Sequence, residues 1–339
     1  MTVSTIITCY NLEKFIGAAI DSVLSQTKVP DEIIVVDDAS TDGSAGIIKS
    51  YQDPRIRYVK MNENSGVLQA TLVGIKHSTG ELLTFLDGDD IWKAEKVEEV
   101  HKAFREDGRI MLVSHNYEII NASGEATGKT DYTQKNIDAI TQDNPTKEIL
   151  SDRVKDSILG YKGIWLGSAY CFKRNSFNIQ EFENYIASFP IPEFSRFCYQ
   201  DHPIAQFIIL NNPSSSLAYL INKVLFQYRM FGLNTSGVSN TLKNALKTIK
   251  KGHANMLATY TLVSRHKHLK DAQKRQKLLI TELDFLEALY TKKYTRAISK
   301  YINLSIHSWN GAKRIKELKR LGGVMILGPE KFLAVKSKT

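Results

Sequence analysis

The chain has 339 residues, of which 42% are hydrophobic, enough to bury the core of one large or two ordinary domains. This composition excludes an intrinsically disordered chain. No run of about 18 apolar residues occurs, and the first residues lack the basic and apolar segments of a secretion signal, so neither export nor a membrane span is expected. Three widely spaced cysteines, Cys9, Cys171 and Cys198, fit buried thiols in a reducing compartment. We expect a globular cytoplasmic protein.

The net charge of +9 is unevenly distributed along the chain. Residues 241–339 contain 22 Lys and Arg against 6 Asp and Glu, a local charge of +16. The preceding 240 residues contain the other 23 basic and 30 acidic residues, which gives them a charge of −7. The sequence therefore predicts an acidic body followed by a basic C-terminal region.

Strand and helix patterns alternate through the first 120 residues. Apolar and β-branched runs predict strands, and apolar residues three or four apart predict helices between them. The predicted strands are Val3–Thr8, Glu32–Val36, Ile56–Lys60, Glu81–Leu86 and Met111–Ile120. The predicted helices are Lys14–Gln26, Thr41–Lys49, Val67–Lys76 and Lys93–Phe104. Strands joined through helices pair in parallel, so we expect an α/β fold with a mostly parallel central sheet and flanking helices.

The second half is less regular until its end. Residues Asp131–Gly160 are polar and predict an irregular segment. The patterns then predict a strand at Gly163–Lys173, a helix at Asp201–Leu210 and a strand within Leu217–Tyr228. Beyond Thr241 the pattern is helical, with two apolar stripes. The stripes are Leu279, Leu283, Leu286 and Tyr290, and Ile298, Ile302, Ile306 and Trp309. We expect a domain at 1–240 and a basic helical appendage at 241–339.

Three carboxylates, Asp87, Asp89 and Asp90, follow the fourth predicted strand directly. Ligands of open α/β sheets bind at the carboxyl ends of strands, and clustered Asp oxygens suit a divalent cation that also binds phosphate. Gly88 would let the backbone approach such a ligand closely. The alternative is an ordinary acidic turn.

A second carboxylate pair, Asp37 and Asp38, follows the second strand at the same predicted edge of the sheet. An ionised carboxylate accepts hydrogen bonds from a nucleobase or a ribose hydroxyl, although Asp38 could instead cap the next helix. Tyr10, directly after the first strand, could stack on a base or belong to the core. These residues predict a site for a metal-bound nucleotide.

Four motifs give the chain a family resemblance. They are SxIITCYNxxxFIxxxIxSVLxQ at 4–26, EIIVVDDxSxDxS at 32–44, NSGVLQA at 64–70 and GELLTFLDGDD at 80–90. With these motifs the chain resembles the family 2 nucleotide-sugar glycosyltransferases of the bacterial cell-surface glycan type. The likeness is close over the first ninety residues and continues weakly to about residue 240. It implies a GT-A fold, with a nucleotide-sugar-binding half at 1–120 and an acceptor-binding half at 121–240.

The resemblance implies roles for residues of the first half. Thr8, Tyr10, Asp37 and Asp38 would hold the nucleoside of a nucleoside diphosphate sugar, and Asp87 would lie near the ribose or the metal. Family tendency favours a UDP-sugar. Asp89 would be the principal ligand of Mn²⁺ or Mg²⁺, with Asp90 as the alternative. The family often has Arg-Asn where this chain has Thr71 and Leu72, which removes phosphate or base contacts expected of that helix.

Two further residues follow from the resemblance in the second half. Asp201, at a predicted helix start, would be the catalytic base that takes a proton from the acceptor hydroxyl, although it could simply cap the helix. Arg229 would contact the diphosphate, because a guanidinium offers paired donors to phosphate, and its alternative is a surface ion pair. Attack opposite the leaving group implies inversion. The acceptor would be a glycan or a lipid-linked saccharide in surface polysaccharide biosynthesis.

The basic C-terminal region leaves two interpretations open. Lys and Arg alternate with apolar residues in Lys313–Lys316 and Lys319–Leu321, which suits an anionic membrane surface at the inner face of the cell membrane. The other interpretation is a solvated helical face. Nucleic acid is not expected, because recognition motifs are absent and aromatic residues are sparse.

Two other functions compete with sugar transfer. A nucleotidyltransferase would show a glycine-rich phosphate loop after the first strand, and Cys9–Leu12 contains none. A non-catalytic module for sugars or membranes could share the fold, but it would not need carboxylates at both strand ends.

Overall fold

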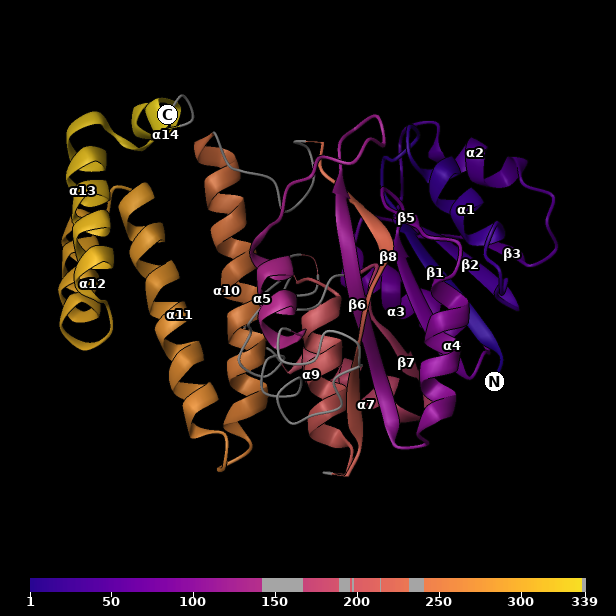
Figure 1. The fold of residues 1–339 in the computed structure, drawn as a ribbon. Coiled ribbons are helices and arrows are strands. Elements are labelled where there is room, and N and C mark those ends of the chain that lie inside the picture. The colour runs from indigo at the N-terminus through magenta and orange to yellow at the C-terminus, as the bar shows by residue number, and fades with distance from the viewer. Residues whose placement is uncertain (142–166, 189–195, 197, 214, 232–240, 337–339) are drawn as a thin grey trace. The chain divides into compact units, whose positions relative to one another are not determined.

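The computed structural model describes residues 1–141, 167–188, 196, 198–213, 215–231 and 241–336. The chain forms two compact units, Met1–Phe231 and Gly232–Thr339, which we call the N-terminal unit and the C-terminal unit (Figure 1). The boundary precedes the one expected at residue 240, and residues 232–240 lie outside the described residues.

Among the described residues of the N-terminal unit, eight strands form one sheet, in the order β3-β2-β1-β4-β7-β6-β8-β5. The strands β1 to β4 pair in parallel, and β7 runs antiparallel between β4 and β6. The mostly parallel α/β fold expected from the sequence is thus confirmed. The strands are β1 (Val3–Cys9), β2 (Glu32–Asp37), β3 (Ile56–Lys60), β4 (Leu82–Asp87), β5 (Ile91–Trp92), β6 (Ile110–Ile120), β7 (Cys171–Lys173) and β8 (Leu217–Arg229).

Helices flank the sheet, as Figure 1 shows. They are α1 (Ile16–Leu24), α2 (Ser44–Ser50), α3 (Val67–His77), α4 (Lys96–Glu106), α5 (Tyr132–Thr141), α7 (Ile179–Ala187) and α9 (Asp201–Asn211). Every residue of β1 is buried, as are all but one in β2 and in β4. A strand that is covered on both faces needs apolar residues on both, which explains why these strands are continuous apolar runs.

The structure corrects the expectation of an irregular segment over Asp131–Gly160 in part. Its first residues form α5, and residues 142–160 lie outside the described residues. Gln134 N–H donates to Asp131 Oδ1 at 3.0 Å, and Asp131 N–H donates to Gln134 Oε1 at 3.2 Å. This reciprocal capping box starts a helix even in a polar segment. The strand predicted at Gly163–Lys173 is shorter where it is described, since only β7 forms there.

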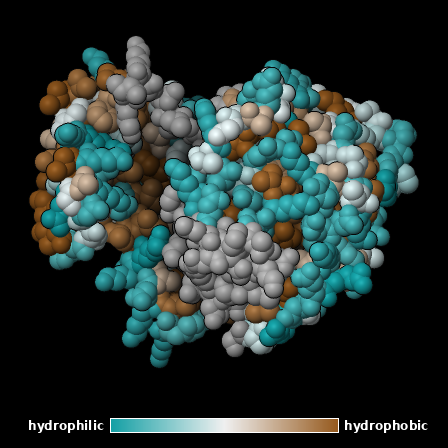
Figure 2. Space-filling view, in the orientation of Figure 1, coloured by the Kyte–Doolittle hydropathy of each residue, from teal (hydrophilic) through white to brown (hydrophobic). Residues whose placement is uncertain are grey.

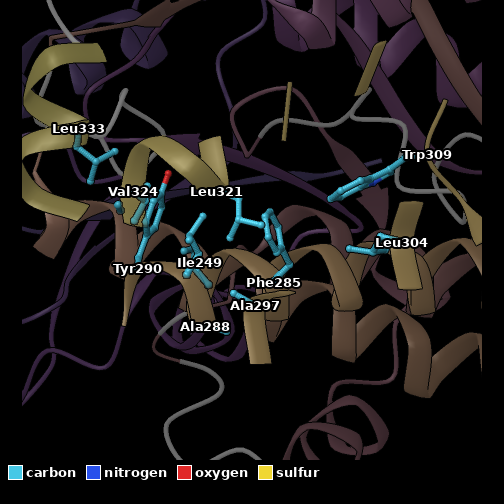
Figure 3. Packing of buried hydrophobic residues seen from close by; sticks show 12 residues of the cluster. Ile249, Phe285, Ala288, Tyr290, Ala297, Leu304, Trp309, Leu321, Val324 and Leu333 are labelled. Carbon is cyan, nitrogen blue, oxygen red and sulfur yellow. The ribbon is translucent and has the colours of Figure 1, made fainter. Parts of the chain in front are cut away.

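The C-terminal unit consists of helices around a separate core. They are α10 (Leu242–Ser264), α11 (Lys270–Tyr290), α12 (Tyr294–His307), α13 (Gly311–Leu327) and α14 (Pro329–Lys336). Phe285 and Trp309 meet edge to face in this core, with ring centroids 5.7 Å apart, and Leu321 and Val324 pack in the same cluster (Figure 3). Among the described residues, no helix has both the length and the hydropathy needed to cross a bilayer.

Only one of the two predicted apolar stripes faces this core. Leu283, Leu286 and Tyr290 of α11 belong to the cluster or pack against it. The stripe on α12 faces outward, because Ile302 is 51% exposed and Ile306 65% exposed. Trp309 lies beyond the end of α12 and is buried.

Candidate functional site

The candidate site lies where three parallel strands end side by side. The register pairs Thr8 with Asp87 and Cys9 with Asp37, so β1 ends between the carboxylates of β4 and β2. The chain adds β2 and β3 on one side of β1 and then crosses to β4 on the other. Such a reversal of strand order opens a crevice at the carboxyl edge of the sheet, where α/β proteins bind ligands.

Asp87 lies at the centre of this edge and is partly exposed. Its Oδ1 accepts hydrogen bonds from Thr8 Oγ1 at 3.2 Å and from Gln200 Nε2 at 2.7 Å. Burial, with the nearby charges of Asp89 and Asp201, raises the pKa of Asp87 to about 7. The ionised form of Asp87 is therefore disfavoured by burial and by two neighbouring acids, one in the turn after β4 and one at the start of α9.

Asp90 is buried, with an exposed fraction of 2%, and both of its carboxylate oxygens accept hydrogen bonds. Ser168 Oγ donates to Oδ2 at 2.6 Å, and the backbone N–H of Arg229 donates to Oδ1 at 2.9 Å. Burial and the charges of Asp89 and Asp87 raise the pKa of Asp90 well above its usual value. The carboxylate of Asp90 thus links the end of β4 to the end of β8 and to the segment before β7.

Asp89 differs from Asp90 in both exposure and contacts. It is partly exposed, and its backbone carbonyl, not its carboxylate, accepts the hydrogen bond from Arg229 Nε at 2.8 Å. Burial raises the pKa of Asp89 to about 6, against the opposing charge of Arg229. Of the two neighbouring carboxylates, that of Asp89 is the more accessible to solvent.

Gly88 serves the protein rather than a ligand. Its N–H donates to the carbonyl of Thr8 at 2.9 Å, and a Cβ at this position would lie 2.7 Å from that oxygen. The close approach expected at Gly88 is therefore to the backbone of β1. Gly167 is equally confined, because a Cβ there would lie 2.4 Å from Gln200 Nε2 and 2.7 Å from Asp87 Oδ2.

A buried lysine lies behind the acidic residues. Lys96 has no exposed surface, its Nζ donates to the carbonyl of Ser168 at 2.6 Å, and it lies 3.6 Å from the centroid of the Trp92 ring. Burial lowers the pKa of Lys96 to about 7, although the charges of Cys171, Asp90 and Asp87 oppose this shift. Lys96 thus donates a hydrogen bond to the carbonyl of Ser168, and the hydroxyl of Ser168 donates to Asp90.

Asp37 and Asp38 both make several contacts within the protein. Asp37 accepts from Ser40 N–H at 2.7 Å and from the Tyr58 hydroxyl at 2.8 Å, and it has no exposed surface. Asp38 accepts from the N–H groups of Ser65 at 2.7 Å and Gly66 at 2.9 Å. Burial raises the pKa of Asp38, against these backbone hydrogen bonds. The two residues order the loops around the crevice, and their contact with a nucleoside stays a prediction.

Tyr10 is the exposed aromatic residue of this edge, with 46% of its surface accessible. It lies between β1 and a loop that is tied to the loop after β2. Asn11, at a φ of 54°, donates its N–H to Ser40 Oγ at 3.0 Å, and its Oδ1 accepts from Thr41 N–H at 2.8 Å. Ala39 also has a positive φ, of 60°. The position of Tyr10 suits stacking on a planar ring.

Asp201 is the first residue of α9 and is buried, with 7% of its surface exposed. Its Oδ1 accepts the N–H of His202 at 2.8 Å and lies 3.5 Å from His202 Nδ1. Gln200, just before it, donates to Asp87 and accepts a short hydrogen bond from the Thr71 hydroxyl. Thr71 thus joins α3 to the site through Gln200, in place of the contacts that the Arg-Asn pair of relatives would make.

Arg229 ends β8 and is buried, with 4% of its surface exposed. Besides Asp89, its guanidinium donates to the carbonyls of Asn121 at 3.2 Å and Ala122 at 3.0 Å. It lies 4.9 Å from the centroid of the Phe15 ring. These contacts position the loop that contains Asp89, and a contact of Arg229 with phosphate stays a prediction.

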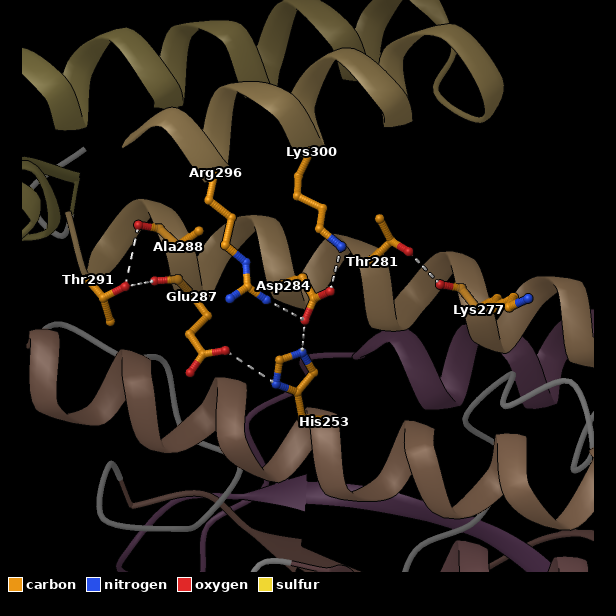
Figure 4. Close-up of polar contacts among 9 residues, drawn as sticks. All are labelled: His253, Lys277, Thr281, Asp284, Glu287, Ala288, Thr291, Arg296 and Lys300. Carbon is orange, nitrogen blue, oxygen red and sulfur yellow. Dashed lines mark hydrogen bonds and ion pairs between the residues drawn. The ribbon is translucent and has the colours of Figure 1, made fainter. Parts of the chain in front are cut away.

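A further cluster of possible metal ligands lies in the C-terminal unit. Ligand atoms of His253, Asp284 and Glu287 lie within 4.8 Å of one another, the only such group of three among the described residues. Lys300 Nζ lies 2.8 Å from Asp284 Oδ2, and Arg296 approaches Asp284 Oδ1 (Figure 4). Because these cations already compensate Asp284, the cluster is an ion-pair network between α10, α11 and α12. A metal site at the carboxyl edge of the sheet would not require three protein ligands close together, since Mg²⁺ is commonly held by one or two carboxylates plus substrate phosphates.

The raised pKa of Asp89 predicts how stability depends on pH. The folded protein binds a proton at Asp89 up to about pH 6, whereas the unfolded chain releases it near pH 4, so this contribution to stability is lost as pH rises through 6. In Asp89→Asn this loss is absent. With EDTA present, we expect the variant to gain roughly 1–2 kcal/mol over the wild type between pH 4.5 and 7.5 in urea unfolding. Parallel pH profiles of the two proteins would contradict the shift.

The bond between Ser168 and Asp90 predicts a second effect on stability. In Ser168→Ala, a buried carboxylate oxygen and the N–H of Asp87, which donates to Ser168 Oγ at 3.0 Å, both lose their partner. We expect the free energy of unfolding to fall by about 2–3 kcal/mol. Ser50→Ala, at an exposed helix end, serves as the control and should change it by less than about 0.5 kcal/mol. An equally small effect of Ser168→Ala would show that water replaces the hydroxyl.

Sequence comparison identifies the first part of the chain. The family model described as glycosyl transferase family 2 matches residues 4–164. An uncharacterized glycosyltransferase of Nostoc sp. is 33% identical over 178 residues, which are 52% of this chain and 49% of the relative. The Escherichia coli protein WfgD, named a UDP-Glc:alpha-D-GlcNAc-diphosphoundecaprenol beta-1,3-glucosyltransferase, is 37% identical over 119 residues, 35% of this chain and 47% of the relative. The chain spans about half the length of these curated relatives.

Solved structures of low sequence identity share the fold. TarS of S. aureus, in complex with UDP-GlcNAc, has a TM-score of 0.54 at 15% identity, and the match covers 89% of each chain. The mannosyltransferase PcManGT of Pyrobaculum calidifontis, in complex with GDP-Man and Mn²⁺, also has a TM-score of 0.54 at 15% identity, covering 98% of this chain and 84% of that one. The family resemblance and fold expected from the sequence are confirmed: residues 4–164 match the glycosyl transferase family 2 model, and the chain shares the GT-A-like fold of these structures.

Proposed function

We propose that this protein is an inverting glycosyltransferase that moves a hexosyl or N-acetylhexosaminyl group from a nucleoside diphosphate donor to a hydroxyl of a glycan or lipid-linked acceptor. One observation carries the proposal. Asp87 and Asp89 lie partly exposed at the carboxyl edge of the sheet, and each has a raised pKa. A cation bound between these two acids would offset the cost of burying their negative charge.

The donor set fits Mn²⁺ or Mg²⁺. Both ions prefer oxygen ligands, and Asp89 offers a carboxylate that is more accessible than its neighbour. Asp90 is the weaker candidate, because it is buried, with only 2% of its surface exposed. We therefore assign the metal to Asp89, assisted by Asp87. A divalent ion bound there would neutralise the charge that develops on the departing diphosphate.

Residues of this chain would bind the donor and move the proton. Tyr10 would stack on the base, and Thr8 and Asp38 would border the nucleoside. Asp201 would accept the proton of the acceptor hydroxyl as that oxygen attacks the anomeric carbon from the side opposite the diphosphate, which inverts the configuration. Its position beside Asp87, whose pKa its charge helps to raise, supports this role.

The named activities of relatives support the finer choices. WfgD is named as a glucosyltransferase that uses a UDP-sugar with a lipid diphosphate acceptor, and TarS was crystallised with UDP-GlcNAc. Both favour UDP as the nucleotide. The name of WfgD also favours a lipid-linked acceptor, which fits a role in cell-surface polysaccharide biosynthesis at the cytoplasmic side of the membrane. Glycosyltransferase names among the relatives also favour sugar transfer over nucleotidyl transfer.

The metal assignment predicts that Asp89→Asn loses Mn²⁺-dependent binding of UDP. We expect at least tenfold weaker binding in calorimetry with Mn²⁺, because a carboxylate ligand is replaced by a neutral amide. Asp107→Asn, just before β6, provides the matched control and should bind UDP like the wild type. A thermal-shift panel of nucleotide sugars with and without Mn²⁺ would identify the donor. Unchanged binding in Asp89→Asn would exclude Asp89 as the ligand.

The base assignment predicts a different profile for Asp201→Asn. Donor affinity should stay within about twofold of the wild type, whereas the rate of transfer should fall by about 10²–10⁴, since the variant cannot accept the proton. Calorimetry measures the first quantity, and release of UDP in the presence of lipid-linked saccharides measures the second. Transfer at the wild-type rate would place the base elsewhere.

A further inference from the structure

Helix α13 presents an apolar stripe to solvent. Its members are Ile315, 59% exposed, Leu318, 54%, Met325, 44%, and Ile326, 82%. At about 100° per residue, these four positions fall within roughly one third of the helix circumference. Leu321 and Val324 of the same helix are buried in the core of the C-terminal unit. Helix α13 is therefore apolar on its solvent face as well as on its packed face.

Helix α12 carries a second exposed stripe. Ile298, Ile302 and Ile306 are four residues apart and are 38%, 51% and 65% exposed, whereas Ala297 and Leu304 of the same helix are buried. Figure 2 shows several hydrophobic residues among hydrophilic ones at the left of the view, over α12 and α13. Exposed apolar side chains that gather on two neighbouring helices of a folded protein mark an interaction site.

The charges around these stripes have one sign. Residues 291–336 contain 11 Lys and Arg and 2 Asp and Glu. On α13 the basic residues Arg314, Lys316 and Lys319 are exposed, while the acidic Glu317 is buried and pairs with Arg320 at 3.0 Å. The partner of this surface therefore has to tolerate apolar side chains and supply negative charge.

We propose that the exposed stripes of α12 and α13 dock on an anionic lipid bilayer, with the isoleucines in the interface and the lysines on the lipid headgroups. Amphipathic helices with basic polar flanks bind membranes in this way without crossing them. A second copy of the chain fits less well, because a symmetric contact would bring the basic flanks of two molecules together. The surface differs from the sequence-based expectation, since Leu321 faces the core and Met325 and Ile326 replace it.

Docking on a bilayer is a property separate from the proposed sugar transfer, and its test does not depend on that activity. Its test is co-sedimentation of the full chain with vesicles of phosphatidylcholine, with and without 30% phosphatidylglycerol. We expect binding at least tenfold stronger to the anionic vesicles and a loss of that preference in 0.5 M NaCl. Equal binding to both vesicle types, or none, would overturn the proposal.

Two double variants separate the apolar and basic contributions. Leu318→Ser with Ile326→Ser should weaken binding to anionic vesicles about tenfold or more, and so should Lys316→Gln with Lys319→Gln. The matched controls lie at exposed positions of the N-terminal unit. They are Val224→Ser for the apolar variant and the double variant Lys60→Gln with Lys102→Gln for the basic variant, and both should bind like the wild type. Circular dichroism verifies that each variant keeps its helices. If the α13 variants leave vesicle binding unchanged and instead abolish self-association in sedimentation velocity, the face belongs to a second copy and the proposal is wrong.

Discussion

The buried carboxylate of Asp90 is the link on which the candidate site depends. It joins the turn after β4 to Ser168 before β7 and to the backbone of Arg229 at the end of β8. Ser168 and Arg229 are 78 and 139 residues away from Asp90 along the chain, so these contacts exist only in the folded sheet. Both oxygens of Asp90 bind within the protein, and its neighbour Asp89 is the more exposed of the two residues.

Burying several acids at one edge of a sheet costs free energy, and nearby basic side chains offset part of the negative charge. Lys96 lies beneath the cluster, in contact with the carbonyl of Ser168, and Arg229 closes the turn from the side. Removing charges from water is tolerable only where partners and hydrogen bonds are supplied. Burial nevertheless raises the pKa values of Asp87 and Asp89, so Lys96 and Arg229 offset its cost only in part.

Much of the fold and part of the site could be predicted from the sequence, because strand patterns specify where side chains leave the sheet. Asp87 and Asp37 end apolar runs, and parallel pairing brings such ends together. Gln200, Ser168 and Lys96 could not be predicted, since their contacts depend on how distant segments pack. The helical period predicted apolar stripes in the C-terminal unit, but not which stripe would pack against the core. Helix α5 was not predicted, although the sequence contains its capping box, Asp131 and Gln134.

The ties between the loops after β1 and β2 have a thermodynamic consequence for recognition. Asn11 exchanges hydrogen bonds with Ser40 and Thr41, and both Asn11 and Ala39 adopt the left-handed backbone conformation that an isolated chain rarely populates. The backbone that carries Tyr10 is thus ordered before any ligand arrives. A planar ring that stacks on Tyr10 would cost little further conformational entropy of the loop, so more of the contact energy would be retained as affinity.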